Sequence, residues 1–234
     1  MIHEPSSLEL VLDLKRTDAQ TPFGTQFREN FKAADRRSDL FYLGRFIGDW
    51  SHELRTMGFT NLIDVVTNGA QSQDSDYRDR AEAFAKLGNY TEHNTKYFQH
   101  FGAELPSFAH RMVQASGLED TTVSLIRQDP GNILPWHQDH FYQLKRKLAD
   151  KGIDPKSARI WRFVVFLEDW TSGHYFQVED TPCVKWRRGD IVTFMPQAFH
   201  LSSNVGTAPK FTLQITGLET QNCLLFKTET EFQI

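Results

Sequence analysis

The segment Pro135-Trp136-His137-Gln138-Asp139 contains the first side chains with the chemistry of a metal site. Residues i and i+2 of an extended segment point to the same side, so the imidazole of His137 and the carboxylate of Asp139 can reach one ion. The tripeptide alone is weak evidence, because a chain with 9 His and 30 Asp+Glu contains such spacings by chance. A surface histidine beside a surface aspartate is the competing interpretation.

A third candidate ligand, His200, follows a predicted strand further along the chain. Two histidines and one carboxylate leave coordination positions open, which is typical of non-haem Fe(II) and not of a closed structural zinc site. Cys183 and Cys223 form no C-x-x-C motif that would support a zinc ribbon. His137, Asp139 and His200 are therefore the predicted catalytic metal ligands. The alternative is a polar loop and a half-buried core histidine.

Lys210 lies ten residues after His200, at the start of a segment in which Phe211, Leu213 and Ile215 alternate with polar residues. If the apolar side packs against a helical layer, Lys210 faces the inside of the fold, where a charge is costly unless it is paired. An anionic ligand would pair with it, for example the far carboxylate of a keto-diacid that chelates the iron. The alternative is a solvated lysine at the end of a strand.

The period of the apolar pattern changes along the chain. From about Ser38 to Met57 apolar residues recur every three or four positions, which predicts a helix that ends at Gly58. Two further helices are predicted at 76–87 and 92–101, and an edge strand at 8–14. We therefore expect residues 1–120 to form a mostly helical supporting region.

After about Thr121 the pattern is that of short strands separated by turns such as Asp129-Pro130-Gly131 and Asn204-Val205-Gly206. Short strands joined by hairpin turns indicate an antiparallel sandwich or barrel. An insertion, 141–158, is expected to contain a helix. The predicted fold class is α+β with a mainly β core: an N-terminal helical layer on a jelly roll at 121–234, in a single domain. The predicted strands are 122–127, 160–167, 174–178, 190–194, 210–216 and 224–230.

From Gln128 to Gly217 the sequence resembles the double-stranded β-helix core, a cupin-like jelly roll, of the Fe(II)/2-oxoglutarate-dependent dioxygenases. Within that superfamily it resembles most the aspartyl/asparaginyl β-hydroxylase and free-proline hydroxylase branch. The resemblance covers about 90 of the 234 residues and depends on the order and spacing of short motifs. The matching residues are, in chain order, Pro130-Gly131, Leu134-Pro135-Trp136-His137-Gln138-Asp139, Trp161–Asp169, Gly189-Asp190, His200, Asn204-Val205-Gly206 and Lys210.

This resemblance implies an oxygenase that uses Fe(II), O2 and 2-oxoglutarate to hydroxylate an unactivated C–H bond, with release of succinate and CO2. The implied substrate is a small molecule, a free amino acid or an amino-acid side chain in a peptide. Lys210 would bind the C5 carboxylate of 2-oxoglutarate, where that branch more often has arginine with its bidentate fork. Arg127 and Arg162 would bind a substrate carboxylate, assist the co-substrate, or pair with surface acids. Trp136 would wall the substrate pocket or pack in the core.

Two other function classes are compatible with the sequence. One is a cupin-type metalloenzyme that does not use 2-oxoglutarate, although cupins usually bring three or four histidines from two motifs. The other is a non-catalytic jelly-roll binding module, which would need neither His200 nor an interior Lys210. The sequence indicates neither the substrate's identity nor the oligomeric state.

Composition excludes several partners. The net charge of −4 and the pI near 6.1 argue against nucleic acid as the ligand. The sequence contains no run of 18 apolar residues, so no membrane span is predicted. The first residues lack the pattern of a signal peptide. We therefore expect a cytoplasmic protein with two reduced thiols.

Overall fold

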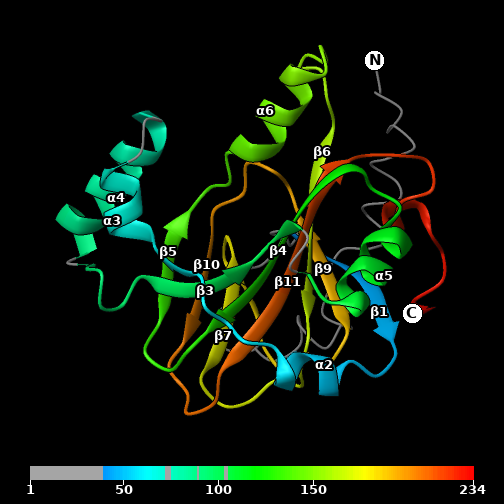
Figure 1. Cartoon of the computed structure of the whole chain (residues 1–234), viewed down its shortest axis with the longest axis horizontal. Coiled ribbons are helices and arrows are strands. Elements are labelled where there is room, and N and C mark those ends of the chain that lie inside the picture. Colours follow the sequence, from blue (N-terminus) through cyan, green and yellow to red (C-terminus); the bar gives the residue numbers. More distant parts are fainter. Residues whose placement is uncertain (1–38, 72–74, 89, 103–104) are drawn as a thin grey trace.

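The computed structural model describes residues 39–71, 75–88, 90–102 and 105–234, and this part of the chain forms two β-sheets with helices around them (Figure 1). The larger sheet has eight strands, in the order β12 (Glu231–Gln233), β1 (Leu40–Ile47), β9 (Asp190–Phe194), β6 (Ile160–Phe166), β11 (Lys210–Leu218), β4 (Glu119–Gln128), β3 (Lys96–His100) and β2 (Leu62–Asp64). The smaller sheet has four strands, in the order β5 (Ile133–His137), β10 (His200–Asn204), β7 (His174–Val178) and β8 (Thr181–Cys183). This is a double-stranded β-helix, or jelly roll, as the sequence predicts.

Central strands of the large sheet bury both faces, because side chains alternate along a strand. In β6, Phe163 and Val165 join the core on the outer face, whereas Val164 and Phe166 join the core between the sheets. Phe176 and Val178 of the small sheet complete the inner core. The outer core is closed by α2 (Ser51–Thr56), α5 (Ser107–Ser116) and the 3-10 helix η2 (Leu224–Phe226).

Three further helices, α3 (Val65–Ala70), α4 (Ser75–Gly88) and α6 (Tyr142–Asp150), lie outside the outer core. The helices α3 and α4 connect β2 to β3, and α6 connects β5 to β6. Figure 1 shows α3 and α4 at one end of the molecule and α6 beyond the ends of β5 and β6. Leu144 and Leu148 of α6 are fully buried against Phe141 and Ile160.

Five of the six strands predicted after residue 121 are confirmed. β7 and β9 have the predicted bounds, and β4, β6 and β11 differ from prediction only at their ends. The predicted helix at 76–87 corresponds to α4, and the insertion at 141–158 contains α6. The predicted strand at 224–230 is wrong: this segment begins with η2, and the next strand, β12, starts at Glu231.

The helix predicted from Ser38 to Met57 is wrong over most of its length. Residues 40–47 form β1, which pairs with β9, and only residues 51–56 are helical. The register of the β1–β9 pair shifts between Tyr42 and Gly44, and Gly44 has a φ of 126° that favours glycine. Because this bulge shifts the alternation and β1 buries both faces, its apolar residues imitate a helical spacing of three and four.

The helix predicted at 92–101 is also wrong, since β3 at 96–100 pairs with β2 and β4. The described residues before 120 therefore supply strands β1, β2 and β3 to the same sheet as the later strands, in addition to the helices α2, α3, α4 and α5. The edge strand predicted at 8–14 lies outside the described residues. No helix in the described part of the chain is long and apolar enough to span a membrane.

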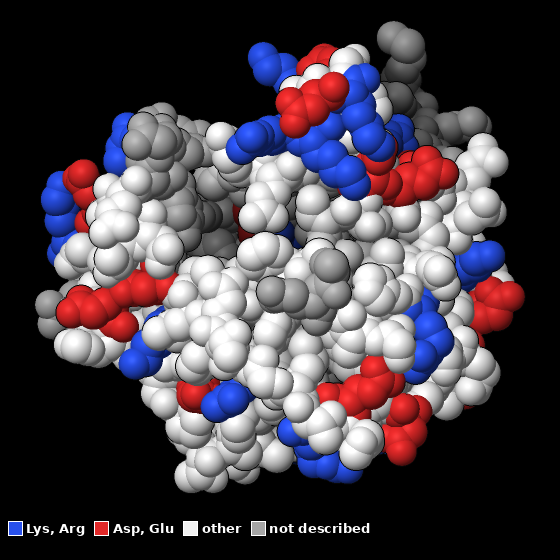
Figure 2. Space-filling view, in the orientation of Figure 1, with Lys and Arg blue, Asp and Glu red and all other residues white. Residues whose placement is uncertain are grey.

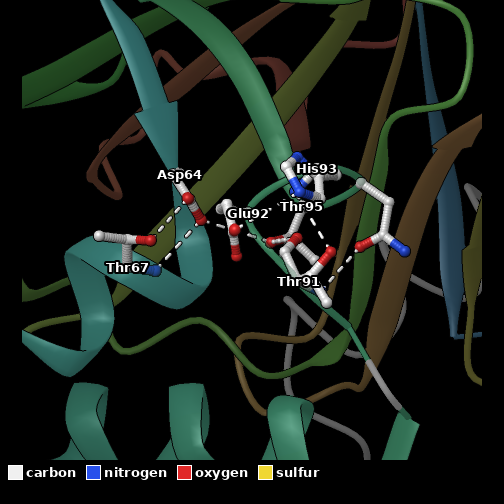
Figure 3. A network of polar contacts seen from close by, with 7 residues as sticks. Asp64, Thr67, Thr91, Glu92, His93 and Thr95 are labelled. Atoms are coloured by element: carbon white, nitrogen blue, oxygen red, sulfur yellow. Dashed lines mark hydrogen bonds and ion pairs between the residues drawn. The ribbon is translucent and has the colours of Figure 1, made fainter.

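A polar network fixes the turn before β3 to the start of α3 (Figure 3). Asp64 caps α3, because its carboxylate accepts hydrogen bonds from the backbone N–H groups of Val66 and Thr67. The hydroxyl of Thr67 donates to the second oxygen of Asp64, at 2.7 Å. Thr95 donates to the carbonyl of Thr91, at 2.8 Å, and lies 3.5 Å from the Asp64 carboxylate. These contacts hold together two elements that wall the cavity described below.

Candidate metal centre

The three predicted ligands converge where β5 and β10 meet. His137 is the last residue of β5, Asp139 lies two residues beyond it, and His200 is the first residue of β10, directly opposite His137. One ligand atom from each of the three residues lies within 4.8 Å of the others. The two imidazole centroids are 4.2 Å apart, and Nε2 of His200 is 3.5 Å from Oδ2 of Asp139.

Backbone carbonyls orient both imidazoles. Nδ1 of His137 is 2.7 Å from the carbonyl oxygen of Pro135, and Nδ1 of His200 is 3.2 Å from that of Ala198. A carbonyl only accepts, so each Nδ1 carries a proton, and Nε2 is the nitrogen of each ring that can bind a metal. A metal-binding histidine is held in this way. Two neutral imidazoles and one carboxylate fit a divalent transition metal with open coordination positions.

The local sequence accounts for the position of the first two ligands. Pro135 lacks a backbone N–H, and β5 is an edge strand of the small sheet, where that missing donor costs no ladder hydrogen bond. After Asp139 the chain turns at Phe141, which has a φ of 50° and precedes α6. A left-handed conformation is costly for a bulky residue, and it directs the chain out of the site.

Arg162 of β6 reaches the same point from the large sheet. Its Nη1 lies 2.7 Å from Oδ2 of Asp139, and its Nε donates to the hydroxyl of Thr216, at 3.0 Å. Its guanidinium carbon lies 5.2 Å from the ring centroid of Phe141. Arg162 therefore orients the carboxylate of a predicted ligand. Its predicted contact with substrate remains a prediction.

A cavity of about 560 Å³ opens beside the three ligands. Figure 2 shows the molecule hollowed between the region of α3 and α4 and the charged helix α6. The volume is in the range of small-molecule sites. Besides His137, Asp139 and Arg162, the lining includes the apolar or aromatic Phe84, Tyr97, Ile126 and Leu134 and the polar Gln99, Thr122, Ser124, Gln214 and Thr216.

Lys210 lies inside the fold, as predicted, with only 2% of its surface exposed. Its ammonium donates to the hydroxyl of Ser202, at 2.6 Å, and to the carbonyl oxygens of Tyr175, at 2.7 Å, and Ser203, at 3.1 Å. Among the described residues no carboxylate forms an ion pair with it, and burial lowers the pKa of Lys210 to about 7. Lys210 is not part of the cavity lining.

The turn that leads to Lys210 is the one predicted at Asn204-Val205-Gly206. The side-chain amide of Asn204 donates to the carbonyl oxygens of Gln128 and Ala208, both at 2.8 Å, and its oxygen accepts from the backbone of Gly206, at 3.0 Å. Lys210 is in register with Gln128 of β4. The asparagine thus fixes the return of the chain from β10 to β11.

The structure places Arg127 and Trp136 outside the lining of the cavity, and their predicted contact with substrate stays a prediction. Arg127 forms two hydrogen bonds with Asp129, at 2.7 and 3.0 Å, and its guanidinium lies against the ring of Phe98. Trp136 is 38% exposed and stacks on Phe199. Arg127 lies on the opposite side of β4 from Ser124 and Ile126, which line the cavity, and Trp136 is not among the lining residues.

Sequence reasoning missed most of the cavity wall. Tyr97 and Gln99 belong to a segment predicted as helix, where their shared face could not be recognised. Gln214 was part of the polar side expected to face the interior, and this signal could have identified it. Thr122 and Ser124 show the same alternation in β4.

No family model and no curated protein matches this sequence. Solved structures with some likeness include a predicted oxalate decarboxylase from Thermotoga maritima, 12% identical, over 53% of this chain and 82% of that chain, with a TM-score of 0.33. A cupin 2 conserved barrel domain protein from Salinispora arenicola is 9% identical over 52% of this chain and 75% of that chain, with a TM-score of 0.32. A Klebsiella pneumoniae protein with a double-stranded β-helix domain is 13% identical over 42% and 63% of the two chains, with a TM-score of 0.29. These identities and TM-scores are too low to carry an argument, so the fold class is defined by the strand order of the two sheets.

Proposed function

We propose that this protein is an Fe(II)/2-oxoglutarate-dependent oxygenase that hydroxylates an unactivated C–H bond of a small molecule or an amino-acid side chain. The observation that carries the proposal is the convergence of His137, Asp139 and His200 beside a cavity, with both imidazoles oriented by backbone carbonyls. Two histidines and one carboxylate with open positions are typical of non-haem Fe(II) oxygenases.

In this proposal Nε2 of His137, Nε2 of His200 and one oxygen of Asp139 hold the iron. The bound iron would activate O2 for a reaction in which 2-oxoglutarate loses CO2 and becomes succinate, while one oxygen atom enters the C–H bond of the substrate. Arg162 would keep the Asp139 carboxylate in position for the metal through its 2.7 Å contact with Oδ2.

The position of Lys210 supports the assignment of 2-oxoglutarate as the co-substrate. Ser202, which accepts a hydrogen bond from Lys210, lies two residues beyond His200 on the same face of β10. This separation is about 7 Å along the strand, comparable to the length of a five-carbon keto-diacid. A buried cation with no acidic partner among the described residues is stabilised by an anion, and the far carboxylate of 2-oxoglutarate supplies one.

A second candidate function is supported by the same residue. Lys210 already donates three hydrogen bonds and does not line the cavity. A cupin-type metalloenzyme that does not use 2-oxoglutarate would leave these bonds in place. The two functions differ in one property that can be measured, the binding of 2-oxoglutarate to the metal-loaded protein.

The test is an anaerobic titration of the Fe(II)-loaded full chain with 2-oxoglutarate, followed by an assay of succinate release in air. The proposal predicts Fe(II)-dependent binding of 2-oxoglutarate with a visible absorption band, and slow succinate release that increases with the right substrate. His200→Ala should lose both signals, whereas His110→Ala, at an exposed position of α5, should keep them. Metal binding without any 2-oxoglutarate binding would favour the second candidate.

A further inference from the structure

The face of the large sheet that looks into the cavity carries a row of uncharged polar side chains. Thr122 of β4 is in register with Thr216 of β11, which is in register with Arg162 of β6. Two residues further along, Ser124 is in register with Gln214. All five residues line the cavity. We call Gln99, Thr122, Ser124, Gln214 and Thr216 the cavity floor; it lies across the cavity from the ligands of the small sheet.

The floor can both donate and accept hydrogen bonds. The side-chain amide of Gln99 donates to the hydroxyl oxygen of Ser124, at 2.6 Å, which leaves the Ser124 proton and the Gln99 carbonyl available. The side chain of Gln214 has no hydrogen-bond partner among the described residues, although it is half-buried in the cavity. Before a ligand binds, water satisfies this amide, and a bound molecule that replaces the water can donate to it and accept from it.

Apart from the metal ion itself, the described lining of the cavity offers a ligand no unmatched side-chain charge. Among the described lining residues, Asp139 and Arg162 are the only Asp, Glu, Lys or Arg side chains, and they pair at 2.7 Å. A substrate carboxylate on the floor would only accept hydrogen bonds, and a substrate ammonium would only donate them. Either would lose its hydration without a counter-charge, which is costly.

Beside the floor the cavity is lined mainly by apolar or aromatic side chains, together with the polar Asn68, His140 and Gln143. The apolar or aromatic part includes Phe84 of α4, Tyr97 of β3, Ile126 of β4 and Leu134 of β5. These side chains favour a ligand with an apolar or flat body, because burial of apolar surface contributes most of the binding free energy. The cavity therefore combines the polar floor with a surface on which an apolar or aromatic body can pack.

We propose that the substrate of this site is an uncharged molecule whose polar edge both donates and accepts hydrogen bonds, as an amide or a hydroxyl group does, and that Gln214 selects it. The inference rests on the proposed function for the identity of the reaction and adds the class of substrate. In this arrangement the polar edge lies on Gln214 and Ser124, the apolar body lies against Phe84 and Tyr97, and the remaining end of the molecule faces the metal ligands.

The test uses the full chain loaded with Mn(II), with and without 2-oxoglutarate, and measures binding of a matched panel by calorimetry. The panel contains uncharged N-acetyl amino-acid amides, the corresponding N-acetyl amino acids as carboxylates, the corresponding amino-acid amides with a free ammonium group, and uncharged sugars. Within each series the uncharged amide should bind at least tenfold more tightly than either charged relative. Binding of the sugars alone would show that the recognised polar group is a hydroxyl and not an amide, and would still support the inference.

Variants at the floor make the assignment to Gln214 specific. Gln214→Leu should weaken the uncharged compounds about tenfold, and Gln214→Glu should shift the preference towards the ammonium compounds. Gln221→Glu, which introduces the same charge at an exposed position outside the cavity, should change neither. Tighter binding of the carboxylates, binding unaffected by Gln214→Leu, or no binding of any uncharged compound at millimolar concentration would overturn the inference. Failure of 2-oxoglutarate to bind would instead contradict the proposed function, because the panel is also measured without it.

Discussion

The two ends of β10 hold two buried polar centres that differ in how they meet their surroundings. At its start, His200 joins His137 and Asp139 beside an open cavity. Towards its other end, Ser202 and Ser203 accept hydrogen bonds from the ammonium of Lys210, which does not line the cavity. The first centre has the form that a metal needs, whereas the second is satisfied by the protein's own oxygens.

This difference shows that the metal site is already formed, whereas binding of 2-oxoglutarate to Lys210 requires a rearrangement of hydrogen bonds. The orientation of both imidazoles is fixed by hydrogen bonds to Pro135 and Ala198, so metal binding needs little rearrangement. A carboxylate that binds Lys210 must replace at least one of its present acceptors. The metal centre and the lysine centre should therefore respond to substitution independently.

The largest effect is expected at the metal end. His200→Ala removes one of three ligands, and we expect it to weaken Fe(II) binding by more than about 100-fold, because even loss of an outer-shell partner costs 10- to 100-fold. Turnover of 2-oxoglutarate should fall below detection. Metal titration and succinate release measure the two effects, and His110→Ala is the matched control. Full activity in the His200 variant would show that this histidine is not a ligand.

A smaller and separate effect is expected at the lysine end. Lys210→Met should raise the KM for 2-oxoglutarate by about 10- to 100-fold, the value of a lost charge-assisted hydrogen bond, and leave Fe(II) affinity unchanged. Lys227→Met, at an exposed position, serves as the control. Steady-state kinetics at varied 2-oxoglutarate measure this change. An unchanged KM would separate Lys210 from the co-substrate and favour the metalloenzyme that does not use it.

The burial of Lys210 also predicts a pH dependence of stability. Its pKa in the folded protein is lowered from 10.5 to about 7, so between these values the unfolded chain binds more protons than the folded one. The free energy of unfolding should therefore rise with pH from about 7 towards 10, with a slope of up to about 1.4 kcal/mol per pH unit. Urea unfolding at pH 7, 8 and 9 should show this rise in the wild type and a smaller one in Lys210→Met. Identical profiles in the two proteins would contradict it.

The smallest effect is expected outside the cavity. Arg127→Lys loses the two-pronged contact with Asp129, which is partly exposed, and should lower the free energy of unfolding by less than about 1 kcal/mol. Because Arg127 does not line the cavity, turnover should stay within about twofold of the wild type. A loss of turnover with retained stability would place Arg127 in contact with substrate after all.

The sequence predicts the β core well where strands are bounded by clear turns. β7 begins directly after the turn at Gly173 and β9 directly after the turn at Gly189, and the bounds of both strands agree with prediction. β1 was not predictable in this way, because the bulge at Gly44 and the burial of both faces imitate a helical period. β3 becomes a strand through its pairing with β4, a contact that local sequence does not reveal.

The same distinction holds for the site. The positions of His137 and Asp139 follow from the spacing within one strand, and the meeting with His200 follows from the expected sandwich. The cavity floor could not be predicted as a whole, because Gln99 and Ser124 come together only when β3 and β4 pair. The pairing of Arg127 with Asp129 depends on which side of β4 faces the cavity, and that side is set by the packing of the sheets.

The most direct test of the metal centre is a crystal structure of the full chain grown with Mn(II) and 2-oxoglutarate, with anomalous scattering used to locate the metal. We expect one Mn(II) with Nε2 of His137, Nε2 of His200 and an oxygen of Asp139 at roughly 2.0–2.2 Å, and the far carboxylate of the co-substrate against Lys210. A metal bound elsewhere in the chain, or a His200 imidazole outside bonding distance of the ion held by His137 and Asp139, would contradict the account.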